Sequence, residues 1–360
     1  MNTFGTRLKF TSFGESHGKA LGCVVDGMPA GIKFDEKFLQ NELKLRKPGK
    51  NKFSSPRKEK DEVEILSGVF QGYTTGTPIS AVVFNKDARS KDYENLKDIF
   101  RLSHADFTYF YKYGINDYRG GGRSSARESI NKVIAGAIAV MLLKEFNIEV
   151  FSGICSIGTK SIDFKNIDFN FCKKSEIFCL DPKYEEEFKK ELLKVKKDKD
   201  SIGASVYTCV KNVPIGLGEV LYDKLDSKLA HALMGINGVK AVEIGAGVKS
   251  SLMRGSNYND ILKDKKFLSN NSGGILGGIS NGSLIEIKTH FKPTPSIFIP
   301  QESMDKKGNN IKYILKGRHD PCIAIRGSVV VNAMVRFILA DLLLLNASSR
   351  LDYLKKIYTF

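Results

Sequence analysis

A run of glycines, serines and arginines stands directly before the clearest helical periodicity in the chain, which covers residues 126–146: Arg119-Gly120-Gly121-Gly122-Arg123-Ser124-Ser125-Ala126-Arg127-Glu128-Ser129. Glycines allow backbone N–H groups to form an anion nest. Serines cap helices or donate to phosphate, and a helix N-terminus favours negative charge. A glycine-rich connector with a helix cap would explain the glycines but not the arginines, which are forked donors for anions. We therefore favour an anion-binding site.

The helical segment itself indicates tight packing. It contains Ala135, Gly136, Ala137 and Ala139, and such small residues allow a second helix to approach closely in a crowded interior. A weaker interpretation is good helix propensity with one tolerated glycine. The preceding run lacks the Lys-Ser/Thr ending of a P-loop, and no Gly-x-Gly-x-x-Gly fingerprint follows a strand. A nucleotide triphosphatase or a Rossmann dehydrogenase is therefore disfavoured.

Outward from this segment, further elements follow from composition and periodicity. Strand-like patterns are expected at residues 62–70, 79–84, 204–210 and 284–290. Helical periodicity recurs at 225–234 and 329–345, and the mixed charges of 185–197 predict a solvated surface helix. No stretch is rich enough in Pro, Gly and Ser to mark a boundary. The pattern predicts one continuous α+β domain over residues 1–360.

The net charge of the chain bears on the kind of ligand that it binds. The 360 residues carry a formal net charge of +16, spread along the chain and richer in Lys than in Arg. A lysine-rich background is one explanation, and a cleft for a polyanionic small ligand is another. Nucleic acid is the least favoured, because nucleic-acid binders usually cluster their basic residues.

The cysteines and the apolar stretches predict a soluble cytoplasmic protein. The six cysteines form no Cys-x-x-Cys pair and no zinc spacing, so they read as reduced thiols and predict no metal site. Residues 1–13 lack a signal-peptide pattern. The longest apolar stretches, 133–143 and 337–345, fall short of the ~18 residues that span a bilayer.

Two histidine-bearing motifs offer proton-transfer chemistry. Residues 14–18 read Gly-Glu-Ser-His-Gly, which places His17 beside Ser16 between two glycines; a polar turn between strands is the alternative. Residues 316–322 read Lys-Gly-Arg-His-Asp-Pro-Cys, with Arg326 four residues later; an ion-paired turn is the alternative. Asp320 precedes Pro321 and is held extended, which suits a fixed carboxylate base.

Three other segments offer groups that bind anions. Residues 45–52 and 54–60 form a basic, Gly/Pro-broken loop that fits a phosphate-binding lid, a nucleic-acid contact or a merely solvated loop. Residues 292–296, Lys-Pro-Thr-Pro-Ser, form a stiff turn with a cation and two hydroxyls, and residues 271–278 are rich in glycine. Each is weak alone.

Taken together, these motifs resemble the chorismate synthase family. The resemblance rests on residues 14–18 running to 25–29, on 122–129, on 317–322, on 61–78 and on 230–245, and it covers about residues 4–345. Three positions depart from the family pattern. Lys47 and Lys52 stand where arginines are usual, so charge is kept but the bidentate fork is lost. Asn332 stands where the family usually carries Glu.

The resemblance implies a carbon–oxygen lyase acting on phosphates. The expected reaction is the anti-1,4 elimination of phosphate from 5-enolpyruvylshikimate-3-phosphate to give chorismate, in the shikimate pathway of aromatic amino acid biosynthesis. It requires reduced FMN with no net redox change, because the cofactor supplies electron density and the protein supplies position and charge. NADPH enters as an indirect reductant. The implied fold is a helical layer sandwiched between antiparallel β-sheets, and the implied assembly is a homotetramer.

The resemblance also assigns residues. His17 is similar to the histidine that protonates the departing phosphate, His104 to the one that manages the proton of the reduced flavin, and Asp320 to the group that removes the C6 proton with the flavin. Ser16 and Ser125 relay or orient. The implied flavin contacts are Arg123, Ser124, Ser125, Asn237, Gly238, Gly277, Lys292, Pro293, Thr294, Pro295, Ser296 and Arg318. The implied substrate or NADP contacts are Arg46, Lys52 and Arg127.

Two rival functions are compatible with parts of the sequence. A nucleic-acid-binding protein would explain the charge but not the histidine motifs, and it predicts steep salt dependence. A flavin oxidoreductase predicts net oxidation of NADPH. The sequence has no nucleotide fingerprint and no additional reductase-like region, so we expect reduced flavin to come from a separate flavin reductase. We interpret His231 and His290 as structural.

Overall fold

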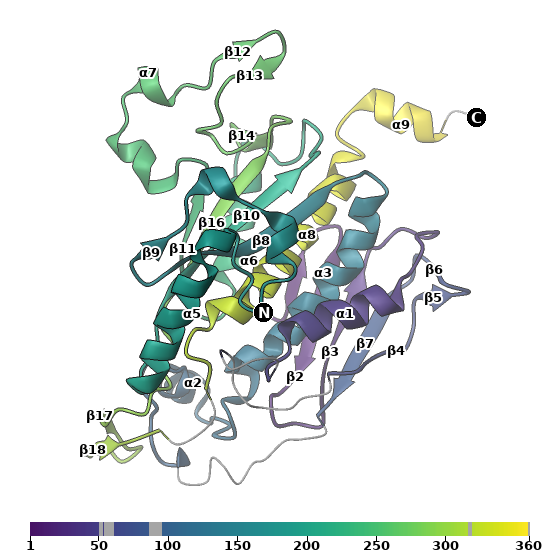
Figure 1. The fold of residues 1–360 in the computed structure, drawn as a ribbon. Helices are drawn as coiled ribbons and strands as arrows, with labels where there is room; N and C mark the ends of the chain where they lie inside the picture. The colour runs from purple at the N-terminus through teal and green to yellow at the C-terminus, as the bar shows by residue number, and fades with distance from the viewer. Residues whose placement is uncertain (50–52, 54–60, 86–95, 316–318, 359–360) are drawn as a thin grey trace.

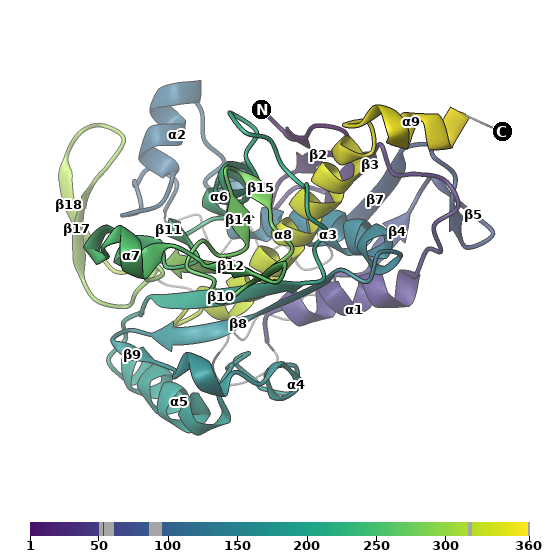
Figure 2. The same ribbon diagram turned by 90° about the horizontal axis from the view of Figure 1, so that it is seen from above.

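The computed structural model describes residues 1–49, 53, 61–85, 96–315 and 319–358. Over these residues, two five-stranded antiparallel sheets enclose a layer of helices (Figure 1). Figure 2 shows α3 (Ser129–Lys144) and α8 (Ala324–Asn346) running between the two sheets. The predicted α+β sandwich is confirmed.

The first sheet is built from the N-terminal part of the chain. Its order is β1 (Thr3–Gly5), β2 (Lys9–Gly14), β3 (Ala20–Asp26), β7 (Ile79–Phe84) and β4 (Val63–Ile65). The strand predicted at 79–84 is confirmed. The single strand predicted over 62–70 is wrong, because the segment divides into β4 and β5 (Val69–Phe70), separated by Gly68 at φ +81°.

The second sheet comes from the middle of the chain. Its order is β11 (Val239–Ile244), β16 (Ile285–Phe291), β10 (Ala204–Lys211), β8 (Glu149–Ile157) and β9 (Lys160–Ser161). The strands predicted at 204–210 and 284–290 are confirmed to within one residue. Alternate residues of β16, such as Ile287 and Phe291, are buried on the face toward α8. The second sheet therefore covers α8 with one apolar face. Such cover is needed because α8 carries apolar residues on all its sides.

The two core helices meet at a glycine. A Cβ added to Gly136 of α3 would lie 2.3 Å from the carbonyl oxygen of Ala333 in α8, so no larger residue fits without moving a helix. This confirms that the small residues of α3 allow close helix approach. The layer is completed by α1 (Glu36–Arg46) and α6 (Leu225–Met234), the latter as predicted.

The remaining elements lie around the sandwich. On the outer side of the second sheet, α5 (Pro182–Lys197) begins at the N-cap Asp181 and carries the predicted i,i+4 pair, Lys189 with Glu185 at 2.8 Å. Phe188 and Leu192 are nevertheless buried, so the helix is amphipathic rather than solvated all round. The others are α2 (Asp106–Tyr113), α4 (Phe169–Cys172), α7 (Gly255–Tyr258), α9 (Leu351–Tyr358), β6 (Tyr73–Thr74), β12 (Leu262–Lys263), β13 (Lys266–Phe267), β14 (Ile275–Leu276), β15 (Ile279–Ser280), β17 (Gln301–Met304), β18 (Asn310–Tyr313) and the 3₁₀ turns η2 (Gly122–Ser124), η3 (Ala126–Glu128), η4 (Phe164–Asn166) and η5 (Gly247–Leu252).

The longest helix, α8, is longer than its sequence pattern predicted. It begins at Ala324 rather than 329 and has 23 residues, so by length and composition it passes the test for a membrane span. Most of its apolar surface is buried against α3 and the second sheet, which is the environment of a core helix. Its one buried carboxylate, Asp341, accepts backbone hydrogen bonds from Thr6, Arg7 and Leu8 at 2.9, 2.7 and 2.8 Å.

Candidate active site

A cavity of about 310 Å³ is lined by residues from five segments: 101–105, 120–127, 237–238, 292–296 and 319–326. Among the described residues that line it, four side chains are cationic, namely Arg101, Arg127, Lys292 and Arg326, whereas Asp320 is the one carboxylate. Such an excess of positive charge in a concave site attracts anions. The anion-binding interpretation of the basic composition stays a prediction, with this cavity as its candidate location.

Two glycines on the cavity wall leave room for the side chains of His17 and Arg101. Gly120 and Gly121 have φ of +71° and +87°, where side-chain-bearing residues are strained. A Cβ on Gly120 would lie 2.5 Å from the His17 ring, and one on Gly121 would lie 3.3 Å from the Arg101 guanidinium. The N–H of Gly120 donates to the Tyr118 carbonyl at 2.8 Å, so this part of the predicted nest is already used.

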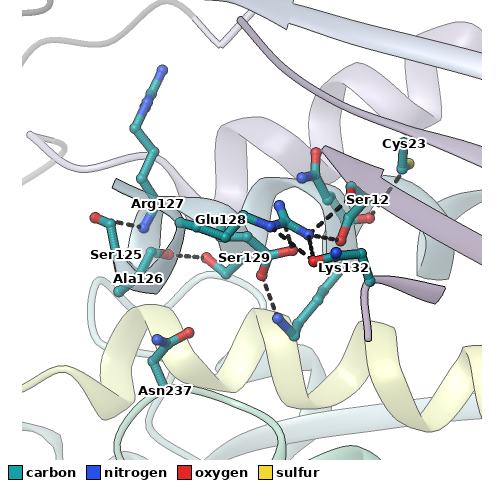
Figure 3. Close-up of polar contacts among 12 residues, drawn as sticks. Ser12, Cys23, Ser125, Ala126, Arg127, Glu128, Ser129, Lys132 and Asn237 are labelled. Atoms are coloured by element: carbon teal, nitrogen blue, oxygen red, sulfur yellow. Dashed lines mark hydrogen bonds and ion pairs between the residues drawn. The ribbon is translucent and has the colours of Figure 1, made fainter. Parts of the chain in front are cut away.

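The segment after the glycines is not yet α-helical. The helix predicted from residue 126 begins three residues later, at Ser129, because the chain first makes the two 3₁₀ turns η2 and η3. Ser125 caps the second turn by accepting from the Arg127 N–H at 3.4 Å, and the Ser129 hydroxyl donates to the Ala126 carbonyl at 2.6 Å (Figure 3). The tighter turns place Ser124, Ser125 and Arg127 along the cavity wall.

His104 has a defined tautomer. Its Nδ1 lies 2.9 Å from the Leu102 carbonyl, which can only accept, so Nδ1 carries the proton. Its Nε2 therefore accepts from the Ser296 hydroxyl at 3.0 Å. Burial, and next the positive charge of Arg101, lower the pKa of His104 to about 4. The imidazole is thus neutral near pH 7, with a lone pair on the atom that faces Ser296.

This depressed pKa predicts a pH-dependent stability. In the unfolded chain His104 is protonated with its ordinary pKa of 6.5, whereas in the folded chain its pKa is about 4. The free energy of unfolding should therefore fall as the pH drops from about 6.5 to about 4, by at most about 3 kcal/mol from this group. Urea unfolding of the wild type and of His104→Asn across this range measures the difference. Parallel curves for the two proteins would contradict the assignment.

The other proton-carrying motif lies behind the glycine turn. The Ser16 hydroxyl is 3.2 Å from His17 Nδ1 and 3.4 Å from the Arg119 carbonyl, and the Ser16 N–H donates to the Gly122 carbonyl at 3.3 Å. Ser16 and His17 do not line the cavity, but His17 touches Gly120, which does. One backbone turn therefore separates His17 from the cavity.

Asp320 lies on the cavity wall and is paired. Its Oδ2 is 2.8 Å from Nη1 of Arg326, six residues later and within the first turn of α8. The neighbouring His319 also lines the cavity. Arg318, predicted to contact flavin, and Lys52, predicted to contact substrate or NADP, lie outside the described residues.

Most of the other predicted flavin contacts are brought together here. Ser124, Ser125, Asn237, Gly238 and residues 292–296 all line the cavity. The Asn237 amide donates to the Ser124 carbonyl at 3.1 Å, which joins two segments more than 100 residues apart. Lys292 Nζ donates to the Ser103 carbonyl at 2.9 Å, and burial together with the charge of Lys240 lowers the pKa of Lys292.

Two predicted flavin contacts lie elsewhere in this structure. Arg123 extends away from the cavity toward β2, where it donates to the carbonyl and hydroxyl of Ser12 at 2.8 and 2.5 Å and to Asn2. Gly277 lies in the turn between β14 and β15, outside the lining residues. Their assignment remains a prediction from the resemblance.

Arg46, predicted to bind substrate or NADP, is buried. Its guanidinium is 1% exposed and lies 2.9 Å from Asp61, which is also 3.2 Å from Arg127. Burial would raise the pKa of Asp61, but the charges of Arg46 and Arg127 outweigh it and lower the pKa. Arg127 also donates to the Asn85 side chain at 2.9 Å. Of the two arginines, only Arg127 reaches the cavity wall.

Sequence reasoning missed a cationic residue of this site. Arg101 lines the cavity and makes a bidentate pair with Asp106 at 2.6 and 2.7 Å; its position three residues before His104 was the available signal. Asn332, where the family usually has Glu, lies outside the cavity. Its amide donates to the Val150 carbonyl and the Ser152 hydroxyl, both at 3.1 Å, a role that a carboxylate could not fill.

The fold is an α+β sandwich, and the described wall of its cavity combines cationic side chains with histidines and a carboxylate, as suits an enzyme that acts on a small molecule. A family model for chorismate synthase matches residues 8–344. Chorismate synthase of Campylobacter jejuni (serotype O:2) is 68% identical over 360 residues, with 99% of both chains covered, and that of Aliarcobacter butzleri is 59% identical with the same coverage. A crystal structure of chorismate synthase superposes with a TM-score of 0.78 at 30% identity and covers 98% of this chain and 96% of its own.

The chain belongs to the chorismate synthase family and is a lyase. The resemblance drawn from the motifs, the fold class and the enzyme class are therefore confirmed. The family requires a reduced flavin and acts on a small-molecule substrate.

Proposed function

We propose that this cavity carries out the anti-1,4 elimination of phosphate from 5-enolpyruvylshikimate-3-phosphate, with reduced FMN bound beside the substrate. The observation that carries this is the meeting of four cationic side chains, a neutral histidine and a paired carboxylate on one cavity wall. Arg101, Arg127 and Lys292 suit the phosphate and carboxylate groups of such ligands.

The residues present fit a flavin nucleotide. The hydroxyl of Thr294 lines the cavity and is buried without a hydrogen-bond partner among the described residues, so it offers a donor to a ligand. Gly238, at φ +88°, has no side chain to fill the space in front of Ile323. Asn237 and Lys292 would hold polar groups of the ring and phosphate. When bound, the reduced flavin supplies electron density that promotes departure of the allylic phosphate.

The chain's own residues would handle protons and charge. In a 1,4-elimination the C6–H electron pair becomes one new double bond, the existing double bond shifts, and the C3–O pair leaves with phosphate. The C6 proton passes to Asp320, and the oxygen of the leaving phosphate receives a proton from His17. Neutral His104 would hold, at Nε2, a proton exchanged with a reduced flavin bound beside it. Bonds broken and formed balance without net oxidation, so no electrons are consumed.

Further properties accompany this proposal. We expect a cytoplasmic homotetramer that binds neither nucleic acid nor membranes, and that depends on a separate flavin reductase, with NADPH as the indirect reductant. The experiment is anaerobic incubation of the pure chain with substrate, oxidised FMN and NADPH. No chorismate should form until a flavin reductase or a chemical reductant is added. Appreciable product from NADPH alone would show that the chain reduces its own flavin.

A further inference from the structure

Arg326 connects the predicted base to a buried part of the fold. Its Nη1 lies 2.8 Å from Oδ2 of Asp320, and its Nε donates to the carbonyl oxygen of Arg46 at 2.9 Å. Both Arg326 and Asp320 line the cavity. The two bonds use different nitrogens of one planar guanidinium, so they fix its orientation as well as its position.

The carbonyl that anchors Arg326 belongs to a rigid site. Arg46 is the last residue of α1, and its own side chain is buried and paired with Asp61, which also pairs with Arg127. Displacing the Arg46 backbone would disturb a buried ion pair, which is costly. Two elements therefore fix Arg326. Its backbone is held in α8, of which it is the third residue, and its side chain is held by the end of α1.

Asp320 needs such support. Pro321 restricts its backbone, but the carboxylate can still rotate about two side-chain bonds. Proton removal from carbon requires the accepting oxygen to be placed within a fraction of an ångström, and a shift of about 1 Å can cost about 10²-fold in rate. An ion pair to one carboxylate oxygen limits this rotation.

We propose that Arg326 is a positioning residue for the elimination, which holds the Asp320 carboxylate in the orientation that removes the C6 proton. This role rests on the lyase function proposed above. Arg326 neither gains nor loses a proton in the step. It acts on the substrate only through Asp320.

The test compares Arg326→Gln, Arg326→Lys and the matched control Arg336→Gln. Arg336 lies in the same helix and also pairs with a carboxylate, Glu42 at 2.6 Å, but it is not among the residues that line this cavity. For each protein one measures kcat, KM, the affinity for chemically reduced FMN, and the primary kinetic isotope effect with substrate deuterated at C6. A residue that serves only folding would not change the isotope effect selectively.

Arg326→Gln should lower kcat about 10²-fold and raise the isotope effect, because C6–H cleavage becomes slower, with FMN affinity within about threefold of the wild type. Arg326→Lys should recover part of kcat, because lysine keeps the charge but loses the fork. Arg336→Gln should leave kcat and the isotope effect unchanged. A kcat within about threefold of the wild type and an unchanged isotope effect in Arg326→Gln would overturn the inference, as would equal losses of kcat and FMN affinity.

Asp320→Asn separates the inference from the proposed function. If Asp320→Asn is inactive while Arg326→Gln turns over normally, Asp320 remains the base and only the role of Arg326 is overturned. If Asp320→Asn is as active as the wild type, both roles are overturned. If the wild type itself forms no chorismate, the lyase function is contradicted and the inference with it.

Discussion

His17→Ala and His104→Ala should each lower turnover by about 10²–10⁴-fold, which is the usual contribution of general acid–base catalysis. His104 is neutral near pH 7 and presents Nε2 toward Ser296, and His17 adjoins the cavity through Gly120. We expect each imidazole to transfer a proton that water would transfer more slowly, His104 from the cavity wall and His17 across the turn at Gly120. Stopped-flow measurement of chorismate formation with excess reduced FMN gives kcat for each variant.

His231→Ala is the control for these variants. His231 lies on the exposed side of α6, against the ring of Phe4 at 5.3 Å, and outside the cavity. Its removal should leave kcat within about threefold, as expected for a surface position. Near-normal turnover in both His17→Ala and His104→Ala would contradict the proton-transfer assignment.

Asp341→Ala should lower the free energy of unfolding by about 3–5 kcal/mol, because it removes a buried charged acceptor that serves three backbone N–H groups. Asp341 is 1% exposed in α8, and the N–H groups belong to Thr6, Arg7 and Leu8, which precede β2. The variant leaves those donors unpaired and loosens the first sheet from the helical layer. Chemical denaturation measures the loss, and amide exchange should show faster opening of β1 and β2.

Asp352→Ala provides the comparison. Asp352 accepts two hydrogen bonds from Arg350, both at 2.8 Å, but the pair is exposed to solvent. Exposed ion pairs contribute at most about 1 kcal/mol. A loss below about 1 kcal/mol in Asp341→Ala would show that the buried carboxylate does not anchor the N-terminal segment.

Local patterns predicted several of the helices and strands, whereas the long-range pairing of the strands came only from the structure. The strand 79–84 and the helix 225–234 were predicted to the residue, because their hydrophobic periodicity is strong. The helix at 324–346 was predicted five residues short at its N-terminus, where Arg326 and Gly327 interrupt the apolar pattern. The pairing of β16 with both β10 and β11 depends on contacts distant in sequence, which periodicity does not report.

The candidate site shows the same contrast between local patterns and contacts distant in sequence. The run of glycines and arginines led us to expect an anion site because its chemistry is local, and the structure places Gly120, Gly121 and Arg127 of that run on the cavity wall. The sequence could not show that Arg46 is buried against Asp61 while Arg127 reaches the cavity, since both are arginines in basic segments. Nor did it show that Arg326 pairs with Asp320, which depends on where α8 begins.

The most direct test of the lyase function is an anaerobic reaction of the purified chain with 5-enolpyruvylshikimate-3-phosphate and chemically reduced FMN. Chorismate, flavin absorbance and released phosphate are followed together. We predict chorismate and phosphate in equal amounts, with the flavin still reduced at the end. Folded, flavin-binding protein that forms no chorismate, or that oxidises one flavin for each product molecule, would contradict the account.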